Sequence, residues 1–386
     1  MDKQNIYFDN NGTTRLHPEV VQIIKQSLDI YGNPSSTHHY GREIEKYINN
    51  SREQIARLIN AEPDEILFTS GGTESNNSVL KLCLQKDFLF SENKPGRIEI
   101  LTSAIEHPSI IKTVKFIKSQ EKECYFLPVD AEGLIDLNVL EEYLKKGCNI
   151  VSIMTANNEI GTIQDIKKIS QLVHSYEGLF HTDAVQALGK IPIDVKAMGI
   201  DYLSLSGHKI YGPKGTGALY VKSGTPFNSY MHGGHQENNL RAGTENTPGI
   251  IGFGEAARIS ERDFVSNQKK LEELSRKLKQ GITKSVPDIR FNCPDSNCLV
   301  QTLNISFPGA LGETIAYHLD KEGIAVSTGS ACSSELSSHV LKSIGLSAEI
   351  ARSSIRISLG IFNTSEEVDY FISAIPNIIT RIRSHS

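Results

Sequence analysis

One lysine of this sequence stands where it could do covalent chemistry. Lys209 directly follows a predicted strand and lies in the segment 204–215, among glycine, serine and histidine residues. A lysine in such a setting can form a Schiff base with a carbonyl compound whose phosphate group is bound nearby. The alternative is a surface lysine in a glycine-rich turn, and we assign that role to Lys214 of the same segment.

A second segment could bind the phosphate group. Residues 69–77 read Thr-Ser-Gly-Gly-Thr-Glu-Ser-Asn-Asn and come at the end of a predicted strand. Small residues here let backbone amides face outward where a helix begins, and a helix N-terminus binds anions. Gly72 and Thr73 are the candidates, with the Thr73 hydroxyl as an added donor. The alternative is an ordinary strand-to-helix turn with capping residues.

Asp183 follows the predicted strand 179–182. The carboxyl ends of parallel strands open into the crevice where ligands of such sheets bind. A carboxylate facing a pyridine nitrogen would keep that nitrogen protonated, as an electron-withdrawing cofactor requires. The alternative is that Asp183 caps a helix.

Cys332 is the candidate nucleophile. The segment 327–334 contains no large side chain, which predicts an accessible thiol rather than a packed one. The alternative is an idle cysteine in a surface loop. Cys83, on an apolar helix face, is expected to be a small buried hydrophobe. Because Cys293 and Cys298 have no second pair or histidine cluster beside them, we predict a structural or incidental role for them and no metal site.

Arg356 is the candidate for binding a substrate carboxylate. It alternates with Ile355 and Ile357 in a predicted strand, so its side chain should point to the opposite face from these two. A guanidinium held there can bind a carboxylate through two parallel hydrogen bonds. The alternative is a structural ion pair.

Length, composition and charge limit the class of protein. The chain has 386 residues, 39% hydrophobic and 22% charged, which is enough for a large core and more than one domain. With a net charge of -5 we expect no direct nucleic acid binding. We expect no membrane association either, because there is no signal-peptide pattern and no apolar run of about 18 residues. Six scattered cysteines are typical of a protein of the reducing cytoplasm.

The elements that must position these side chains alternate between short apolar runs and helical periodicity. Such alternation predicts an α/β fold, with a mainly parallel seven-stranded sheet covered by helices on both faces. The candidate strands are 65–69, 98–102, 124–128, 150–154, 179–182, 202–205 and 218–221. Helices between them include 137–146 and 166–176.

A charged helical stretch near residue 260 opens a second set of elements. Its predicted strands are 302–307, 325–327 and 355–358, and its last amphipathic helix is 366–384. We therefore predict a large domain, 16–258, and a smaller C-terminal α/β domain, 259–386, which carries the Cys332 segment. The N-terminal segment, 1–15, is expected to pack with the small domain.

The order of these motifs resembles that of the cysteine desulfurases of the NifS/IscS type, in the class V aminotransferase family of fold-type I pyridoxal-phosphate enzymes. The resemblance runs from Tyr7 to Gly360, nearly the whole chain. Besides the segments above, the matching ones are 7–14, 32–36 with His38, 106–107, 157–161 and 241–246.

The resemblance implies contacts to the ring of a pyridoxal 5'-phosphate cofactor. Lys209 would carry the cofactor as a Schiff base and later move the Cα proton of the substrate. His107 would stack on the ring as a further catalytic residue, while Asp183 pairs with the ring nitrogen. Gln186 would reach the phenolic oxygen, and Asn158 would bond to the cofactor or the substrate.

It also implies contacts to the phosphate and the substrate. The phosphate would be held by Gly72, Thr73, Ser206 and His208. Thr244 would reach the phosphate of the neighbouring subunit, which implies a homodimer with shared sites. The substrate L-cysteine would be bound by Arg356, Asn158 and Asn33.

The activity implied by the resemblance is removal of sulfur from L-cysteine. Cys332 would receive the sulfur as a persulfide, alanine would leave, and a sulfur-acceptor protein would take the sulfur for iron–sulfur cluster assembly or for thiolation of tRNA or DNA. The stretch 332–340 is shorter than in housekeeping members, and the chain ends at Ser386 without the tail that docks their iron–sulfur scaffold. A specialised acceptor is therefore expected.

Two other classes of function remain as alternatives. A selenocysteine lyase or another class V enzyme would share the fold, but it would not need a thiol among small residues, as at Cys332. A non-catalytic sulfur carrier or assembly partner that kept the fold would be expected to have lost at least one of Lys209, Asp183, His107 and Cys332, and all four are intact.

Overall fold

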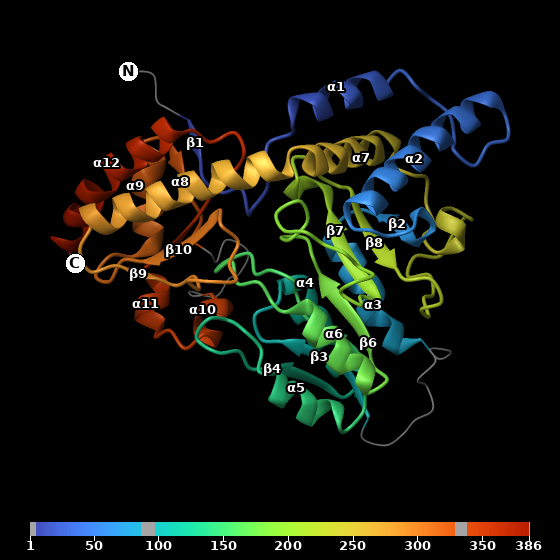
Figure 1. Ribbon diagram of the computed structural model, residues 1–386, viewed down its shortest axis with the longest axis horizontal. Helices are drawn as coiled ribbons and strands as arrows, with labels where there is room; N and C mark the ends of the chain where they lie inside the picture. The colour runs from blue at the N-terminus through green and yellow to red at the C-terminus, as the bar shows by residue number, and fades with distance from the viewer. Residues whose placement is uncertain (1–4, 86–96, 329–337, 386) are drawn as a thin grey trace.

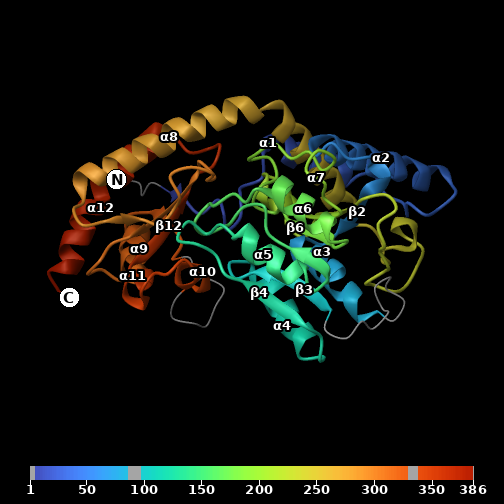
Figure 2. The same cartoon turned by 60° about the horizontal axis from the view of Figure 1, so that its bottom comes forward.

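The computed structural model of the chain describes residues 5–85, 97–328 and 338–385. Figures 1 and 2 show two groups of elements, a larger one around a seven-stranded sheet and a smaller one around a three-stranded sheet. The helices α7 (Thr247–Arg262) and α8 (Phe264–Ser285) run from one group to the other. Cys332, the predicted nucleophile, lies outside the described residues.

The large sheet confirms the predicted, mainly parallel architecture. Its strand order is β2-β8-β7-β6-β5-β3-β4; β8 is antiparallel to both neighbours, and the other pairs are parallel. In that order the strands are Ile66–Thr69, Gly217–Val221, Tyr202–Ser206, Leu179–Asp183, Cys148–Ser152, Ile98–Ser103 and Cys124–Leu127. Each corresponds to a predicted strand with slightly shifted ends.

Helices cover both faces of this sheet because its strands are apolar on both sides. Ile100 and Leu101, neighbours on β3, are fully buried and point to opposite faces. Leu101 belongs to the same hydrophobic cluster as residues of α6 (Ile166–Ser175), and Ile100 to that of α4 (Pro108–Lys118). The other helices of this group are α1 (Pro18–Ser27), α2 (His39–Leu58), α3 (Gly72–Leu80) and α5 (Leu137–Leu144). With both faces covered, the strand ends are left as the place for a ligand.

The smaller group is built on an antiparallel sheet. Its middle strand, β10 (Thr302–Ser306), pairs with β12 (Ser354–Ser358) and β9 (Arg290–Phe291). Near the N-terminus, β1 (Ile6–Tyr7) pairs in parallel with β11 (Ile324–Ala325). The helices are α8, α9 (Gly312–Lys321), α10 (His339–Ser343), α11 (Ala348–Arg352) and α12 (Ser365–Arg383). The N-terminal strand thus adds to the small group although the next residues lead to the large one.

Some predicted ends were wrong. The predicted strand 325–327 ends at Ala325, and Ser327 makes only an isolated antiparallel bridge to Arg356. The predicted helix 137–146 ends at Leu144, ahead of Gly147 with its positive φ of 82°. The predicted division at 258/259 falls inside α7, so the domain boundaries stay a prediction.

Candidate active site

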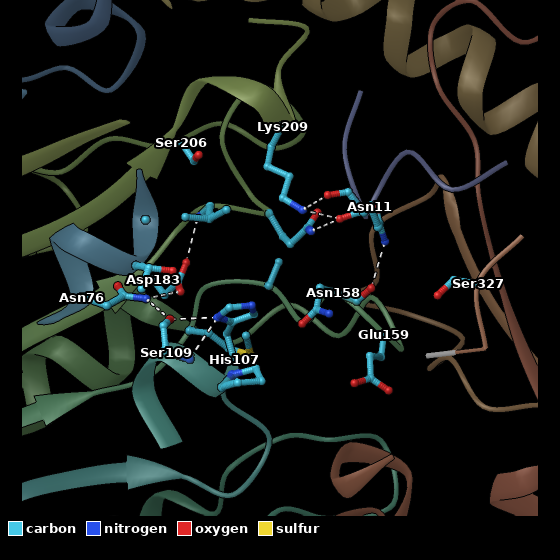
Figure 3. A pocket seen from close by; sticks show the side chains of 18 of the residues that line it. Asn11, Asn76, His107, Ser109, Asn158, Glu159, Asp183, Ser206, Lys209 and Ser327 are labelled. Atoms are coloured by element: carbon cyan, nitrogen blue, oxygen red, sulfur yellow. Dashed lines mark hydrogen bonds between the residues drawn. The ribbon is translucent and has the colours of Figure 1, made fainter. Parts of the chain in front are cut away.

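A cavity of about 360 Å³ lies at the carboxyl ends of the parallel strands, between the large sheet and β12. Most of the residues predicted to bind cofactor or substrate line it, and Figure 3 shows several of them converging. They are Gly72, Thr73, His107, Asn158, Asp183, Gln186, Ser206, His208, Lys209 and Arg356.

Lys209 ends a short 3-10 helix, Gly207–Lys209, directly after β7. Its Nζ donates hydrogen bonds to the backbone carbonyls of Asn11 and Gly12, at 2.7 Å for Gly12 (Figure 3). The sequence did not single out these carbonyls. The amine therefore lies in the cavity wall, where a carbonyl compound could react with it. Lys214, by contrast, is exposed and does not line the cavity.

Helix α3 begins at Gly72, where the sequence predicts the phosphate site. The preceding Gly71 has a φ of 151°, which favours glycine, and a Cβ there would meet only Ser206 Oγ within 4 Å, at 3.9 Å. The first amides of a helix have no partner within the helix, and this end carries partial positive charge. Together with the hydroxyls of Thr73 and Ser206, these amides form a donor set suited to a phosphate.

Asp183 is the last residue of β6 and is 5% exposed. The backbone amide of Val185 donates to its Oδ1 at 2.9 Å, and the side-chain amide of Asn76 donates to its Oδ2 at 2.7 Å. An ionised carboxylate has further lone pairs and can only accept. Asp183 can therefore take a hydrogen bond from a protonated ring nitrogen in the cavity.

His107 caps the N-terminus of α4, and the backbone amide of Ser109 donates to its Nδ1 at 3.1 Å. Burial lowers the pKa of His107; Asp183 opposes this effect, whereas Lys209 and His339 add to it. The ring is therefore neutral near pH 7. Because Nδ1 accepts a hydrogen bond, the ring proton is on Nε2.

His208 lies beside the lysine and near the N-terminal segment. Its Nδ1 is 3.0 Å from Thr13 Oγ1. Burial lowers the pKa of His208 to about 4, with contributions from Lys209, Lys214 and Lys190. Its imidazole is therefore neutral and can offer a phosphate a hydrogen bond but no full charge.

Gln186 shares a hydrogen-bond acceptor with the lysine. Its Nε2 donates at 2.8 Å to the backbone carbonyl of Asn11, which also accepts from Lys209 Nζ. The Gln186 amide thus lies next to the candidate reactive amine. Asn11 connects this side to the opposite wall, since its Nδ2 donates to the carbonyl of Asn158 at 3.1 Å.

Arg356 lies on β12, and its apolar neighbours Ile355 and Ile357 are fully buried in the core of the small group. The expected alternation is confirmed, because the Arg356 side chain lines the cavity instead. Its Nη2 lies 2.6 Å from Asp9 Oδ1, and its Nη1 donates to the Asn158 carbonyl at 3.1 Å. Arg356 therefore makes the ion pair that was the alternative and also faces the cavity.

Ser338 and Glu159 are among the cavity residues that the sequence did not single out. Ser338, the N-cap of α10, donates from Oγ to Glu159 Oε2 at 2.5 Å. Burial raises the pKa of Glu159 to about 7, although Ser338 and Arg356 oppose the rise. Glu159 could have been noticed in the sequence, because it lies in the segment 157–161 that shares the family resemblance. Its burial is seen only in the tertiary structure.

Two of the predicted site residues that the structure describes, Thr244 and Asn33, are not in the cavity lining of this single chain. Thr244 is exposed and lines a separate hollow of about 130 Å³ with Ser70 and Arg241. Asn33 is exposed, and its Oδ1 accepts from the backbone amide of Ser35. Cys332 lies outside the described residues.

The donor set fits pyridoxal phosphate. The α3 N-terminus and its hydroxyls suit the phosphate, Asp183 suits a protonated ring nitrogen, and Lys209 supplies the amine that a carbonyl cofactor needs. In the described part of the chain, buried Arg356 Nε has no hydrogen-bond partner. This donor could serve the carboxylate of an amino acid.

Other features of the described residues add no competing site. The described cysteines are free, and Cys83 is buried as predicted. Within residues 5–85, 97–328 and 338–385, no cluster of three or more histidine, cysteine, aspartate or glutamate residues could hold a metal ion. No helix in these ranges is long and apolar enough to span a bilayer.

Comparison with known proteins places the chain among class-V enzymes. The family model described as "Aminotransferase class-V" matches residues 6–371. The chain is similar to the protein "Cysteine desulfurase IscS" of Dictyoglomus turgidum, with 44% identity over all of this chain and 97% of the relative.

Solved structures agree with this similarity. The chain resembles a structure titled "NIFS-LIKE PROTEIN" with a TM-score of 0.91 and 37% identity, covering 98% of this chain and 100% of that one. It resembles "SspA in complex with cysteine" with a TM-score of 0.81 and 35% identity, covering 93% and 100%.

Proposed function

Since this chain belongs to the class-V aminotransferase family, and within it to the cysteine desulfurases of the IscS and NifS type, we propose that it takes sulfur from L-cysteine and leaves it on Cys332. The observation that carries the proposal is a cavity in which Lys209, Asp183 and Arg356 meet at the N-terminus of α3. These groups are an amine, a carboxylate and a guanidinium. They suit an amino-acid substrate together with a phosphorylated pyridine cofactor.

Enzymes of this family use pyridoxal phosphate, which when bound withdraws electrons from the bonds at the Cα of an amino acid. Lys209 would hold the cofactor through its amine, and the same amine would move the proton at Cα of the substrate. Asp183 would accept a hydrogen bond from the protonated ring nitrogen, and the neutral His107 would contact the ring. Gly72 and Thr73 hold the phosphate together with Ser206 and His208.

Arg356 sets the position of the substrate. Its guanidinium binds the carboxylate of L-cysteine, with Asp9 and the Asn158 carbonyl fixing its orientation from behind. Lys209 lines the same cavity as Arg356, and so does Ser327, which precedes Cys332 by five residues.

Cys332 performs the sulfur transfer. Its thiolate attacks the sulfur of the bound substrate, so that a sulfur–sulfur bond forms as the bond between sulfur and Cβ breaks. The electron pair of the broken bond stays with Cβ, which takes up a proton to give alanine. Because the ring proton of His107 is on Nε2, this side chain is one source of that proton.

We also propose a homodimer and a protein acceptor. Thr244 and Asn33 are exposed in the single chain, as expected if they complete the site of a second copy. The persulfide passes to a sulfur-acceptor protein that serves iron–sulfur cluster assembly or thiolation of tRNA or DNA. With free cysteines and a net charge of -5, a cytoplasmic location without nucleic-acid contact fits best.

The proposal is tested by measuring alanine and sulfide release from L-cysteine with a reductant. Wild type should turn over and Cys332→Ala should not, although the variant should still bind cofactor and cysteine. Cys298→Ala is the matched control, because that thiol does not line the cavity, and it should turn over. Equal turnover by wild type and Cys332→Ala would overturn the role of Cys332.

The same variants distinguish the alternative of a selenocysteine lyase. Such an enzyme would release selenide from L-selenocysteine with or without Cys332. Loss of cysteine turnover together with unchanged selenide release in Cys332→Ala would show that the thiol serves cysteine alone. If L-selenocysteine were the only substrate of wild type, the lyase would replace the desulfurase.

A further inference from the structure

Lys190 is a lysine in a setting that is unfavourable for its charge. Burial lowers the pKa of Lys190 well below its ordinary value, and the positive charges of Lys209 and Arg356 lower it further. Both of these neighbouring charges are positive, so the charged form of Lys190 is disfavoured here.

The Lys190 amine bonds to a residue of the cavity wall, Gln186. Its Nζ donates to Gln186 Oε1 at 2.7 Å, and Gln186 Nε2 in turn donates to the Asn11 carbonyl at 2.8 Å. The Asn11 carbonyl can only accept, so the Gln186 NH₂ group must face it, and Gln186 Oε1 is left to accept from Lys190. The orientation of the Gln186 amide is therefore fixed from both sides.

The local sequence explains why the two side chains meet. After β6 the chain makes tight turns, in which the Ala187 amide donates to the Ala184 carbonyl and the Lys190 amide to the Ala187 carbonyl. Gly189 has a φ of 67°, which favours glycine. These turns bring the side chains of Gln186 and Lys190, four residues apart, within hydrogen-bond distance of each other.

From this arrangement we propose that Lys190 is a positioning residue. It holds the Gln186 amide so that its NH₂ group, and not its oxygen, faces the phenolic oxygen of the cofactor. The inference rests on the proposed contact between Gln186 and the cofactor. Without Lys190 the amide could turn its oxygen toward an anionic ring oxygen, which would repel it.

A double-mutant cycle in the holoenzyme tests this inference. The variants are Lys190→Met, which keeps the length of the side chain but removes the donor, Gln186→Ala, and the two combined. For each we would measure the cofactor dissociation constant and the position of the long-wavelength absorbance band of the bound cofactor. Lys196→Met is the control, because this exposed lysine pairs with Glu62 at 2.6 Å on the surface.

Each single variant should weaken cofactor binding about tenfold, the effect of losing one hydrogen bond near a charge, and should shift the band in the same direction. The double variant should be no weaker than Gln186→Ala, because Lys190 acts through Gln186. Lys190→Gln, which restores a donor, should recover part of the affinity, and Lys196→Met should match wild type.

The outcomes distinguish the proposed contact between Gln186 and the cofactor from the proposed role of Lys190. If Gln186→Ala leaves both readouts unchanged, its proposed cofactor contact is wrong and the inference is overturned with it. If Gln186→Ala changes them and Lys190→Met does not, only the role of Lys190 is overturned. Additive effects in the double variant would likewise overturn it, since they would mean that Lys190 acts independently of Gln186.

Discussion

Asn76, inside α3, donates a hydrogen bond of 2.7 Å to Asp183 at the end of β6, and both side chains are buried. The same amide group donates to Ser109 Oγ at 2.9 Å, and that hydroxyl lies 2.8 Å from His107 Nδ1. The Asn76 amide is thus bonded directly to Asp183 and, through the Ser109 hydroxyl, to His107 (Figure 3). Asp183 and His107 are the two residues proposed to contact the cofactor ring. Asn76 therefore couples the position of Asp183 to that of His107.

Replacing Asn76 should weaken cofactor binding. Asn76→Ala removes one of the two donors to Asp183, so its carboxylate is held less firmly and the cofactor dissociation constant should rise about tenfold. Asn76→Asp should bind still more weakly, because a second carboxylate would compete for the same proton. Titration of the apoenzyme with cofactor measures both effects. Asn77→Ala, on the same helix but bonded to the Thr73 carbonyl, should bind as wild type does.

Arg356→Lys should raise KM for L-cysteine by about 100-fold and change kcat much less. A lysine keeps the positive charge but lacks the planar guanidinium, which can bind a carboxylate through two parallel hydrogen bonds. This guanidinium also bonds to Asp9 and to the Asn158 carbonyl at the same time. Steady-state kinetics of alanine release give both constants. Arg352→Lys, an exposed position on α11, should change neither; an unaltered KM in Arg356→Lys would mean that Arg356 serves only its ion pair with Asp9.

Several residues proposed to carry chemistry could be placed from the sequence, because their positions depend on the strand or helix that precedes or contains them. Lys209 and Asp183 follow strands, Gly72 begins a helix after a strand, and Arg356 alternates with isoleucines. Strand and helix periods place such residues on a known side or end of an element. The fold class followed from the same periods.

Residues that position those groups could not be found this way. The Asn76–Ser109 contact requires α3 to pack beside α4, and the Lys209 contacts are backbone carbonyls of the N-terminal segment. No local pattern encodes a partner that is distant in the chain. Lys190 is an intermediate case, since its spacing of four from Gln186 can be read from the sequence but the hydrogen bond between the two side chains cannot.

Glu106 should make the stability of the protein depend on pH. It is fully buried, its Oε1 accepts from Ser103 Oγ and the Met154 amide, and burial raises its pKa from 4.5 to about 8. The folded protein therefore keeps this proton up to about pH 8, whereas the unfolded chain loses it near 4.5. The neutral form stabilises the fold at low pH, and this contribution is lost as pH rises through that window.

In Glu106→Gln this loss should disappear. Between pH 6 and pH 9 the wild type should lose about 3 kcal/mol of unfolding free energy through Glu106, and the variant should not. Urea unfolding at both pH values gives the difference between the two proteins. Glu43→Gln, at an exposed position of α2, should follow wild type. If Glu106→Gln loses as much stability as wild type does, the Glu106 carboxyl is already ionised at pH 6.

Thr244 should act on the site of the partner subunit. Thr244→Asp would place a carboxylate near the phosphate, and Lys209→Ala would remove the reactive amine, so each variant should be nearly inactive as a homodimer. In a heterodimer of the two, one site combines the intact Lys209 of one subunit with the intact Thr244 of the other. Co-expressed and purified through two different tags, this heterodimer should recover about half of the wild-type rate, as expected for one complete site of two. If Thr244 served its own chain, neither site would be complete, and the heterodimer would stay inactive.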